Sequence, residues 1–395
     1  MPVAICHPGV PSIVKFVPLK LMRMDSLTLL LVGLSALIWL IILLLPWQPW
    51  RNTETLEMDH QGIQVDLSDI TVVIPARDES GVIQTTLAAL VEQGDRLRVI
   101  LVDDCSTDGT SGAALQVQGV DLSIISGAAL PPGWSGKLWA LEQGVRQVDT
   151  RLTLLLDADI KLGQGVLGAL KEKMLTDGTQ FVSIMASLRM VNFWEKLLMP
   201  AFIYFFKLLY PFRLTNSQNT HFSSAAGGCI LLETRLFEEI GGLEAIKDAV
   251  IDDCTLAREV KRRGHRMWIG QSRAVESVRV YEDLGVIWDM IARSAFSQLN
   301  YSILILTGLT LVMGIMFWAP VLGTITLNPA VLLLSITAYL AMIISYLPTI
   351  RYYGLKSTWA LLMPVIGTLY LAMTWSSAFR FWRGERTRWK SRVYR

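Results

Sequence analysis

The sequence predicts an α/β domain with a mostly parallel sheet, joined to one N-terminal and about three C-terminal transmembrane helices. Of the 395 residues, 52% are hydrophobic and only 18% are charged, and the mean hydropathy is +0.42. Soluble domains carry about 25% charged residues. Lys, Arg, Asp and Glu are also absent from residues 26–50, 294–350 and 357–379. The remainder has an ordinary composition, which excludes a pure transporter and a disordered chain.

The charge-free stretches divide the chain. A hydrocarbon core of roughly 30 Å needs about 20 apolar helical residues, so the three stretches hold one, two and one spans. We expect an N-terminal extension over residues 1–25, with Met22 and Met24 as alternative starts, and a transmembrane anchor over residues 26–50. An α/β domain then occupies residues 51–300, transmembrane helices occupy residues 301–379, and a basic tail of cytoplasmic type occupies residues 380–395.

The charges also separate by segment. Residues 1–50 sum to +2, residues 351–395 to +8 and the part between to −8. Seven of the last sixteen residues are Lys or Arg, which predicts contact with anionic lipid headgroups on the cytoplasmic leaflet. No nucleic acid partner is predicted, because this tail directly follows a hydrophobic span. The four cysteines have neither disulfide-framework nor zinc-ligand spacing.

Within the central domain, short β-branched runs alternate with helical stretches. Strands are expected over residues 70–75, 97–103, 122–126 and 152–157, with helices over residues 79–92, 109–118 and 137–148. The first, second and fourth strands end in polar residues. Because ligands of such sheets bind beyond the carboxyl ends of the strands, we expect a shared site at that edge.

Two carboxylates at the fourth strand end suggest a metal site. Asp157 and Asp159 lie two residues apart after an apolar strand, so they face the same side in extended geometry. Hard oxygen donors of this kind hold Mg²⁺ or Mn²⁺ that also touches a diphosphate. Taken alone, an Asp-x-Asp string more often marks a turn, but here it follows two other acidic strand ends.

Asp103 and Asp104 stand at the end of the second strand. The residues after them are also typical of a helix start, with Ser106 or Asp108 as the N-cap. A cap does not explain the two earlier carboxylates, and Asp104 is suited to accept a hydrogen bond from a base imide or a ribose hydroxyl. Lys137 opens the next helix, where a cation meets phosphate beside free backbone N–H groups. A solvated helix start is the alternative for Lys137.

Six motifs in this order resemble the family 2 glycosyltransferases with the GT-A nucleotide-diphospho-sugar transferase fold, over about residues 70–300. They are residues 71–79 (TVVIPARDE), 102–110 (VDDCSTDGT), 136–144 (GKLWALEQG), 155–159 (LLDAD), 227–232 (GGCILL) and 252–257 (DDCTLA). Within that family, residues 131–140 (PPGWSGKLWA) and 296–302 (FSQLNYS) are most similar to the hopene-associated glycosyltransferases.

The resemblance implies roles for matching positions. The nucleoside of the donor would be bound by Ala76, Arg77, Glu79, Asp103 and Asp104, and its diphosphate by Lys137 and Asp157. The Mg²⁺ or Mn²⁺ ion would be held by Asp157 and Asp159. Gly227 and Gly228 would lie near the acceptor, and Asp253 would be the general base, supported by Asp252. Asp252 stands where the family has Glu. The Gln-x-x-Arg-Trp motif is absent, which argues against a processive polymer synthase and favours the addition of one sugar.

A membrane position for the site is expected from residues 193–212, an aromatic-rich stretch interrupted by Glu195 and Lys207. An interfacial helix here would bring the catalytic edge to the bilayer, whereas a buried core helix is the alternative. A third full C-terminal span would place the basic tail outside, against the positive-inside rule. Either one C-terminal segment, that containing Pro364, is re-entrant, or the 193–212 region crosses.

These observations lead to a functional hypothesis. We expect a multi-pass protein of the cell membrane with a cytoplasmic catalytic domain, acting as an inverting, metal-dependent hexosyltransferase. It would move one sugar from a nucleotide-sugar donor, a UDP-sugar, to a membrane lipid such as a hopanoid or a related isoprenoid lipid. The alternatives are a polyisoprenyl-phosphate sugar synthase, whose acceptor needs no strong base, and a non-enzymatic membrane-tethered nucleotide-binding scaffold.

Overall fold

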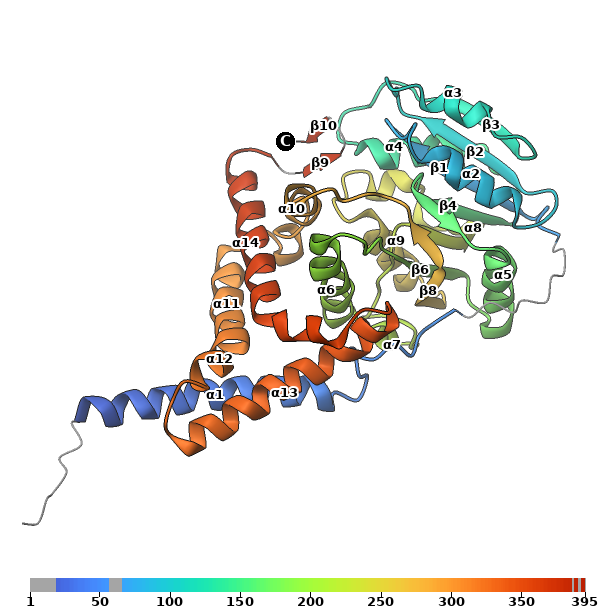
Figure 1. Ribbon diagram of the computed structural model, residues 1–395. Coiled ribbons are helices and arrows are strands. Elements are labelled where there is room, and N and C mark those ends of the chain that lie inside the picture. The colour runs from blue at the N-terminus through green and yellow to red at the C-terminus, as the bar shows by residue number, and fades with distance from the viewer. Residues whose placement is uncertain (1–18, 57–65, 386, 390–391, 395) are drawn as a thin grey trace, which may run out of the picture.

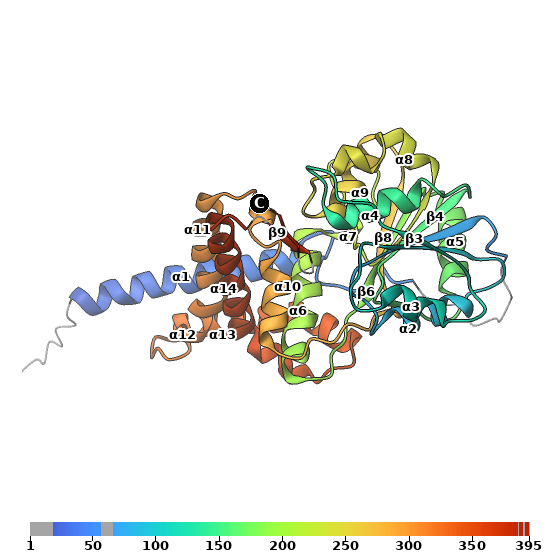
Figure 2. The ribbon, with the colours of Figure 1, turned by 90° about the horizontal axis from the view of Figure 1, so that it is seen from above.

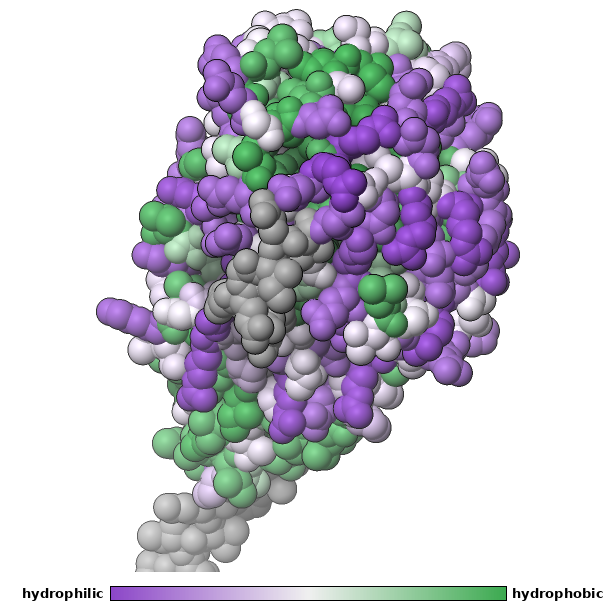
Figure 3. All heavy atoms as spheres, turned by 90° about the vertical axis from the view of Figure 1, so that its right-hand side faces the viewer, coloured by the Kyte–Doolittle hydropathy of each residue, from purple (hydrophilic) through white to green (hydrophobic). Residues whose placement is uncertain are grey.

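The computed structural model describes residues 19–56, 66–385, 387–389 and 392–394. Most of the extension predicted over residues 1–25 therefore lies outside the described residues. The chain forms an α/β domain beside a group of long apolar helices (Figure 1). The face of the α/β domain turned away from these helices is mostly hydrophilic, and hydrophobic surface gathers at the top and bottom of this view (Figure 3).

An eight-stranded sheet forms the centre of the α/β domain, in the order β3-β2-β1-β4-β7-β6-β8-β5. The strands are β1 (Ile70–Ala76), β2 (Arg98–Asp103), β3 (Asp121–Ser126), β4 (Leu152–Leu156), β5 (Ile160–Leu162), β6 (Phe181–Ser187), β7 (Cys229–Glu233) and β8 (Met267–Ser277). All four predicted strands are confirmed, with ends that shift by one residue at most. A separate hairpin pairs β9 (Thr387–Trp389) with β10 (Arg392–Tyr394).

The sheet is mostly parallel, as predicted. Strands β3, β2, β1 and β4 pair in parallel, β7 is antiparallel to both of its neighbours, and β6 and β8 are parallel. Every residue of β1 and β4 is buried, which is what continuous runs of Val, Ile and Leu produce in a sheet covered on both faces. The carboxyl ends of β1, β2 and β4 therefore meet at one edge.

Helices cover both faces of the sheet (Figures 1 and 2). They are α2 (Ile83–Val91), α3 (Thr110–Leu115), α4 (Gly136–Val145), α5 (Val166–Asp177), α8 (Arg235–Ile240), the short η1 (Leu243–Ile246) and α9 (Asp252–Arg262). Helix α10 (Leu284–Ala292) instead packs against α6 and α14. The helix expected from residue 79 begins only at Ile83. Its first residues are diverted because the Glu79 and Ser80 N–H groups donate to Thr110 and Asp108 of the neighbouring loop.

Four helices are long and apolar enough to cross a membrane among the described residues, namely 26–44, 303–323, 329–352 and 357–382. They comprise α1 (Leu19–Leu44), α11 (Ile303–Met313) with the π-helical turn η3 (Gly314–Trp318) and α12 (Ala319–Gly323), α13 (Pro329–Tyr352), and η4 (Ser357–Leu362) with α14 (Met363–Trp382). The α1 and α13 helices lie side by side, and α11 and α14 run across them (Figures 1 and 2).

The aromatic-rich stretch of residues 193–212 forms α6 (Phe193–Leu209), followed by the short α7 (Phe212–Thr215). Tyr204 is fully buried and its hydroxyl shares a 2.8 Å hydrogen bond with Ser345 of α13. The ring of Phe205 packs edge-on against Tyr370 of α14, with centroids 4.9 Å apart. Helix α6 thus lies between the sheet and the long apolar helices, and one hydrophobic cluster includes side chains from both.

A buried carboxylate fixes the start of α6. Glu195 accepts hydrogen bonds from the backbone N–H groups of Val191, Asn192 and Tyr281 and forms an ion pair of 2.8 Å with Arg189. Asn192 completes a capping box with it. Burial alone would raise the pKa of Glu195, but these donors outweigh it and lower the pKa. One side chain therefore joins α6 to the ends of β6 and β8.

We predict that Glu195→Gln lowers the free energy of unfolding by about 1–3 kcal/mol, because the amide places a donor against backbone N–H groups that then lack an acceptor. Thermal unfolding of the full-length protein in detergent measures this. The control is Glu172→Gln on the exposed face of α5, which should change stability by about 0.5 kcal/mol or less. Equal effects of the two substitutions would show that the buried carboxylate is not the anchor of α6.

Candidate active site

The carboxyl ends of β1 and β2 carry two interlocked turns. Asp78 and Cys105 adopt left-handed backbone conformations with φ of 52° and 55°, which cost free energy for residues other than glycine. Reciprocal hydrogen bonds hold the turns together. The Asp78 N–H donates to Ser106 Oγ at 3.0 Å, and the Thr107 N–H donates to Asp78 Oδ1 at 2.8 Å. The two strand ends therefore form one rigid rim.

The residues predicted to bind the nucleoside lie on this rim. Ala76 is buried at the end of β1, and its carbonyl accepts the Asp104 N–H at 2.8 Å. Arg77 donates to the Asp104 carbonyl at 2.5 Å and lies 3.5 Å from its carboxylate. Asp103 is engaged in its own turn, where it accepts hydrogen bonds from the Ser106 N–H and the Ser111 hydroxyl. Its carboxylate thus shapes the turn that presents Asp104.

The helix after the second turn starts later than predicted. Gly109, with φ of 86°, is the N-cap of α3, so neither Ser106 nor Asp108 takes that position. Asp108 still accepts the Thr110 N–H at 3.1 Å and also the Ser80 N–H at 2.9 Å. The pKa of Asp108 is about 2, because these hydrogen bonds outweigh its burial. Asp108 therefore ties the loop after β1 to the start of α3.

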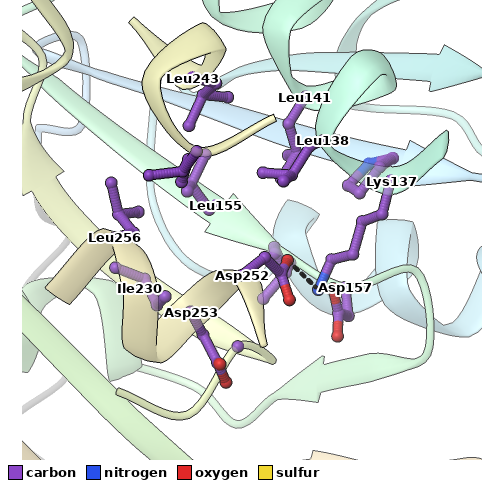
Figure 4. A pocket seen from close by; sticks show the side chains of 14 residues that line it. Lys137, Leu138, Leu141, Leu155, Asp157, Ile230, Leu243, Asp252, Asp253 and Leu256 are labelled. Atoms are coloured by element: carbon purple, nitrogen blue, oxygen red, sulfur yellow. Dashed lines mark ion pairs between the residues drawn. The ribbon is translucent and has the colours of Figure 1, made fainter. Parts of the chain in front are cut away.

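Lys137 is the centre of a charged pocket. Its ammonium lies 2.9 Å from Asp157 Oδ1 and 3.4 Å from Asp252 Oδ2. Figure 4 shows the lysine reaching from the start of α4 to these two carboxylates, while the Asp253 side chain points away from it. The pocket is lined on its inner side by apolar residues, including Leu138, Leu155 and Leu256.

Local structure accounts for this convergence. Ser135 caps α4 by accepting the Leu138 N–H, so Lys137 stands in the first turn of that helix. Asp157 directly follows β4, and Asp252 and Asp253 are the first two residues of α9. Acidic residues are favourable at a helix start, where the backbone dipole is positive. Two helix starts and one strand end therefore bring a cation and three carboxylates together.

The pKa values of these groups reflect burial and mutual charge. Burial would lower the pKa of Lys137, but Asp157 and Asp252 outweigh it and raise the pKa, so the side chain stays an ammonium. Burial and then the charge of Asp252 raise the pKa of Asp253 to about 7, despite the opposing effect of Lys137. A carboxylate that titrates near neutral pH can accept and release a proton under physiological conditions.

The glycine pair before β7 closes the pocket. A Cβ atom at Gly227 would lie 3.1 Å from Asp253 Oδ2 and 3.4 Å from Lys137 Nζ, and one at Gly228 would lie 3.1 Å from Ile160. The first two distances are tight for a side chain, so glycine lets the backbone approach both charged groups. The Gly228 carbonyl also accepts the Asp157 N–H at 3.0 Å. The predicted acceptor-side pair is thus adjacent to the predicted base.

The second carboxylate of the Asp157-Ala158-Asp159 string is held apart from Lys137 by another cation. Asp159 Oδ2 accepts hydrogen bonds from Arg279 Nε at 2.8 Å and from Ser277 Oγ at 3.1 Å. Arg279 also lies 2.9 Å from Glu79. Arg279, which follows β8, is not among the residues predicted from the sequence. The sequence feature that could have indicated Arg279 is a basic residue just after a strand in an otherwise acidic domain.

The sequence predicts that Asp157 and Asp159 hold a divalent cation at this edge. Such an ion needs oxygen ligands that lie close together. No group of three or more His, Cys, Asp or Glu side chains among the described residues gathers to hold a metal ion. Mg²⁺, however, commonly takes one or two carboxylates and fills its remaining positions with water and substrate phosphates. Asp157, with a third of its side chain exposed, meets that requirement. The residues fit a metal bound together with its substrate.

The base side of the pocket adjoins the apolar helices. Tyr210 ends α6, and its hydroxyl donates to Gln298 Oε1 at 2.5 Å, just before α11. Burial raises the pKa of Tyr210, and the negative charge of nearby Asp253 adds to this effect. The Tyr210–Gln298 hydrogen bond joins the end of α6 to the segment just before α11, part of a candidate membrane helix.

Comparison with known proteins shows which family the central region is similar to. Residues 71–241 match the family described as Glycosyl transferase family 2. The chain is 30% identical over 109 residues to a 4,4'-diaponeurosporenoate glycosyltransferase of Staphylococcus aureus (strain N315), which is 28% of this chain. The alignment spans about a quarter (27%) of the length of that relative. The central region is therefore similar to this family over residues 71–241, and the match does not give the activity of the whole protein.

A solved structure supports the fold over nearly the full length. A mannosyltransferase from Pyrobaculum calidifontis, in complex with GDP-Man and Mn²⁺, superposes with a TM-score of 0.50. The two are 19% identical, and the match covers 93% of this chain and 98% of that one. This likeness shows a shared GT-A architecture, including the predicted α/β domain.

We predict that Lys137→Met destabilises the protein more at about pH 8 than at about pH 5. Without the ammonium, Asp157, Asp252 and Asp253 repel one another when ionised, and this repulsion weakens once Asp253, whose pKa is about 7, is protonated. Thermal unfolding of the full-length protein at both pH values measures the difference. Lys161→Met, at an exposed position of β5, is the control. A loss of stability by Lys137→Met that is independent of pH would contradict the charge-balancing role.

Proposed function

We propose that this chain, which carries a glycosyl transferase family 2 domain over residues 71–241, is a membrane-bound inverting glycosyltransferase. It moves one hexose from a nucleotide-sugar donor to the hydroxyl of a lipid. The observation that carries the proposal is that one pocket holds two groups suited to this reaction. One is an ammonium bound by Asp157 and Asp252, and the other is a buried carboxylate, Asp253, whose pKa is about 7.

The chemistry follows from this charge distribution. An incoming hydroxyl attacks the anomeric carbon of the sugar while a nucleoside diphosphate leaves from the opposite side. Asp253 accepts the proton of the hydroxyl as the new glycosidic bond forms. Lys137 lies across the pocket from Asp253 and offsets the negative charge that develops on the leaving diphosphate. Attack opposite to the leaving group inverts the anomeric centre, and Gly227 leaves room between the two groups.

The donor occupies the rim formed by the ends of β1 and β2. Ala76, Arg77 and Asp104 line the nucleoside position, Asp103 shapes the turn, and Glu79 is oriented by its ion pair with Arg279. We assign the donor as a UDP-sugar. Asp157 and Asp159 would hold Mg²⁺ or Mn²⁺, which when bound supplies Lewis-acid charge at the diphosphate. Arg279 already compensates the charge of Asp159 in the structure.

The acceptor is proposed to be a lipid because of where the base lies. Gly227 lies beside Asp253, the charge of Asp253 reaches Tyr210, and the Tyr210–Gln298 hydrogen bond joins the end of α6 to the segment before α11. The curated relative is named for transfer to diaponeurosporenoate, a carotenoid. Sequence motifs favour the hopene-associated group, so we propose a hopanoid or a related isoprenoid lipid as the acceptor. A cytoplasmic catalytic domain in the cell membrane follows from the location of nucleotide sugars.

We predict that Asp253→Asn reduces sugar transfer by about 10²-fold or more, since removal of a general base costs that factor. Affinity for the nucleoside diphosphate with Mg²⁺ should stay nearly unchanged, because Asp157 and Lys137 are retained. Product formation on lipid vesicles and calorimetric titration of UDP measure the two quantities. Asp121→Asn, at the exposed start of β3, is the matched control.

Two outcomes of this experiment would redirect the assignment. Equal loss of donor affinity and turnover would move Asp253 into the donor site. Normal turnover of Asp253→Asn with a polyisoprenyl-phosphate acceptor would favour the synthase alternative, because a phosphate needs no strong base. Absence of any product with either acceptor, together with intact UDP binding, would support the nucleotide-binding scaffold.

We predict that the transfer rate at saturating donor rises as the pH increases through about 7 and then levels off. The sign follows from the raised pKa of Asp253: below it the carboxyl is protonated and cannot accept a proton. Asp252→Asn removes a neighbouring charge that raises this pKa, so the midpoint of the profile should move to lower pH. A midpoint unaffected by Asp252→Asn would show that another group controls the profile.

A further inference from the structure

The segment of residues 357–382 is apolar and long enough to cross a membrane, yet contacts along its length tie it to the α/β domain. Just before it, the guanidinium of Arg273 in β8 lies 4.6 Å from the ring centroid of Tyr352, the last residue of α13. The ring of Trp359 in η4 packs against Phe193, the first residue of α6, with centroids 5.5 Å apart. The entry to the segment is thus at the α/β domain.

The middle of the segment also contacts α6. The Tyr370 hydroxyl donates to the Leu198 carbonyl of α6 at 2.8 Å. Tyr370 also packs against Phe205, about two turns further along α6. The α14 helix therefore lies against α6.

The end of the segment returns to the α/β domain as well. Arg380 forms an ion pair of 2.5 Å with Asp289 of α10. Ser377 Oγ accepts the Phe296 N–H at 3.0 Å, and Phe381 stacks on Tyr301 with centroids 4.4 Å apart. Because α10 follows β8 directly, the exit of the segment lies beside the same domain as its entry.

The α13 helix shows the contrasting arrangement. Its C-terminal end meets the α/β side, where the Pro348 carbonyl accepts Asn52 Nδ2 at 2.8 Å and Asn52 also binds Lys207 of α6. Near its start, Ser335 lies against Gly323 of α12, and Leu334 lies against Gly33 of α1. One end of α13 is at the domain and the other packs among apolar helices, as expected for a crossing helix.

We propose that residues 357–382 do not cross the membrane and that both of their ends lie on the catalytic side, so that the basic tail faces the same anionic headgroups as the catalytic domain. Charge placement agrees with this arrangement. Arg351 and Lys356 precede the segment, and Arg380 and Arg383 end it. With both flanks on one side, all four cations satisfy the positive-inside rule, whereas a full crossing would place one pair on the wrong side.

Cysteine labelling in sealed vesicles tests this proposal independently of the enzymatic activity. The full-length protein, with Cys6 and Cys105 replaced by Ser, receives one new cysteine at a time: Ser357→Cys before the segment, Arg383→Cys after it, or Lys161→Cys on the surface of the α/β domain. A membrane-impermeant maleimide is applied to vesicles of each orientation. Labelling after detergent solubilisation confirms that each cysteine can react.

We expect Ser357→Cys and Arg383→Cys to react in those vesicles in which Lys161→Cys reacts, and to be protected in vesicles of the opposite orientation. Reaction of Arg383→Cys only in the opposite orientation would show a full crossing and overturn the proposal. Reaction from neither side would also overturn it, because the tail would then not lie in the aqueous headgroup region. None of these outcomes depends on whether the protein transfers a sugar.

Discussion

The site depends on one cation enclosed by like charges. Lys137 lies within 2.9 Å of Asp157 and 3.4 Å of Asp252, and its charge also opposes the rise in the pKa of Asp253. Three carboxylates gathered at one strand end and one helix start could not remain close together without it. The close approach of Gly227, the acidic start of α9 and the position of Asp157 after β4 all fit around this ammonium.

Carboxylates are also paired with cations in the neighbouring parts of the sheet edge. Arg279 lies between Glu79 and Asp159, and Arg77 lies beside Asp104. Each acidic group of the predicted donor region thus has a cation or a set of backbone N–H groups within reach. Ligand phosphates entering this edge would compete for cations already engaged with carboxylates. Donor binding must therefore rearrange ion pairs rather than fill an uncharged cleft.

The sequence predicted the parallel half of the sheet well, because β1 to β4 have strong apolar runs with polar residues at their ends. It also placed Lys137, Asp157, Asp252 and Asp253 in one site, which the structure brings together. Arg279 escaped prediction because its partners, Glu79 and Asp159, are 200 and 120 residues away. The depth of α6 was left open, since an aromatic-rich amphipathic pattern suits both an interfacial helix and a buried one. Only tertiary packing against Ser345 and Tyr370 distinguishes them.

The hydrophobic cluster around α6 links the α/β domain to the apolar helices, and this link limits how the two parts can change during evolution. Side chains of α6 pack with those of α1, α10, α13 and α14 in one continuous core, and Glu195 anchors that helix to the strands that position Arg279. An α/β domain joined to its apolar helices in this way cannot be exchanged as an independent module. Changes in the apolar helices must be accommodated by α6, and through it by the pocket, so the two parts of the chain are expected to diverge together.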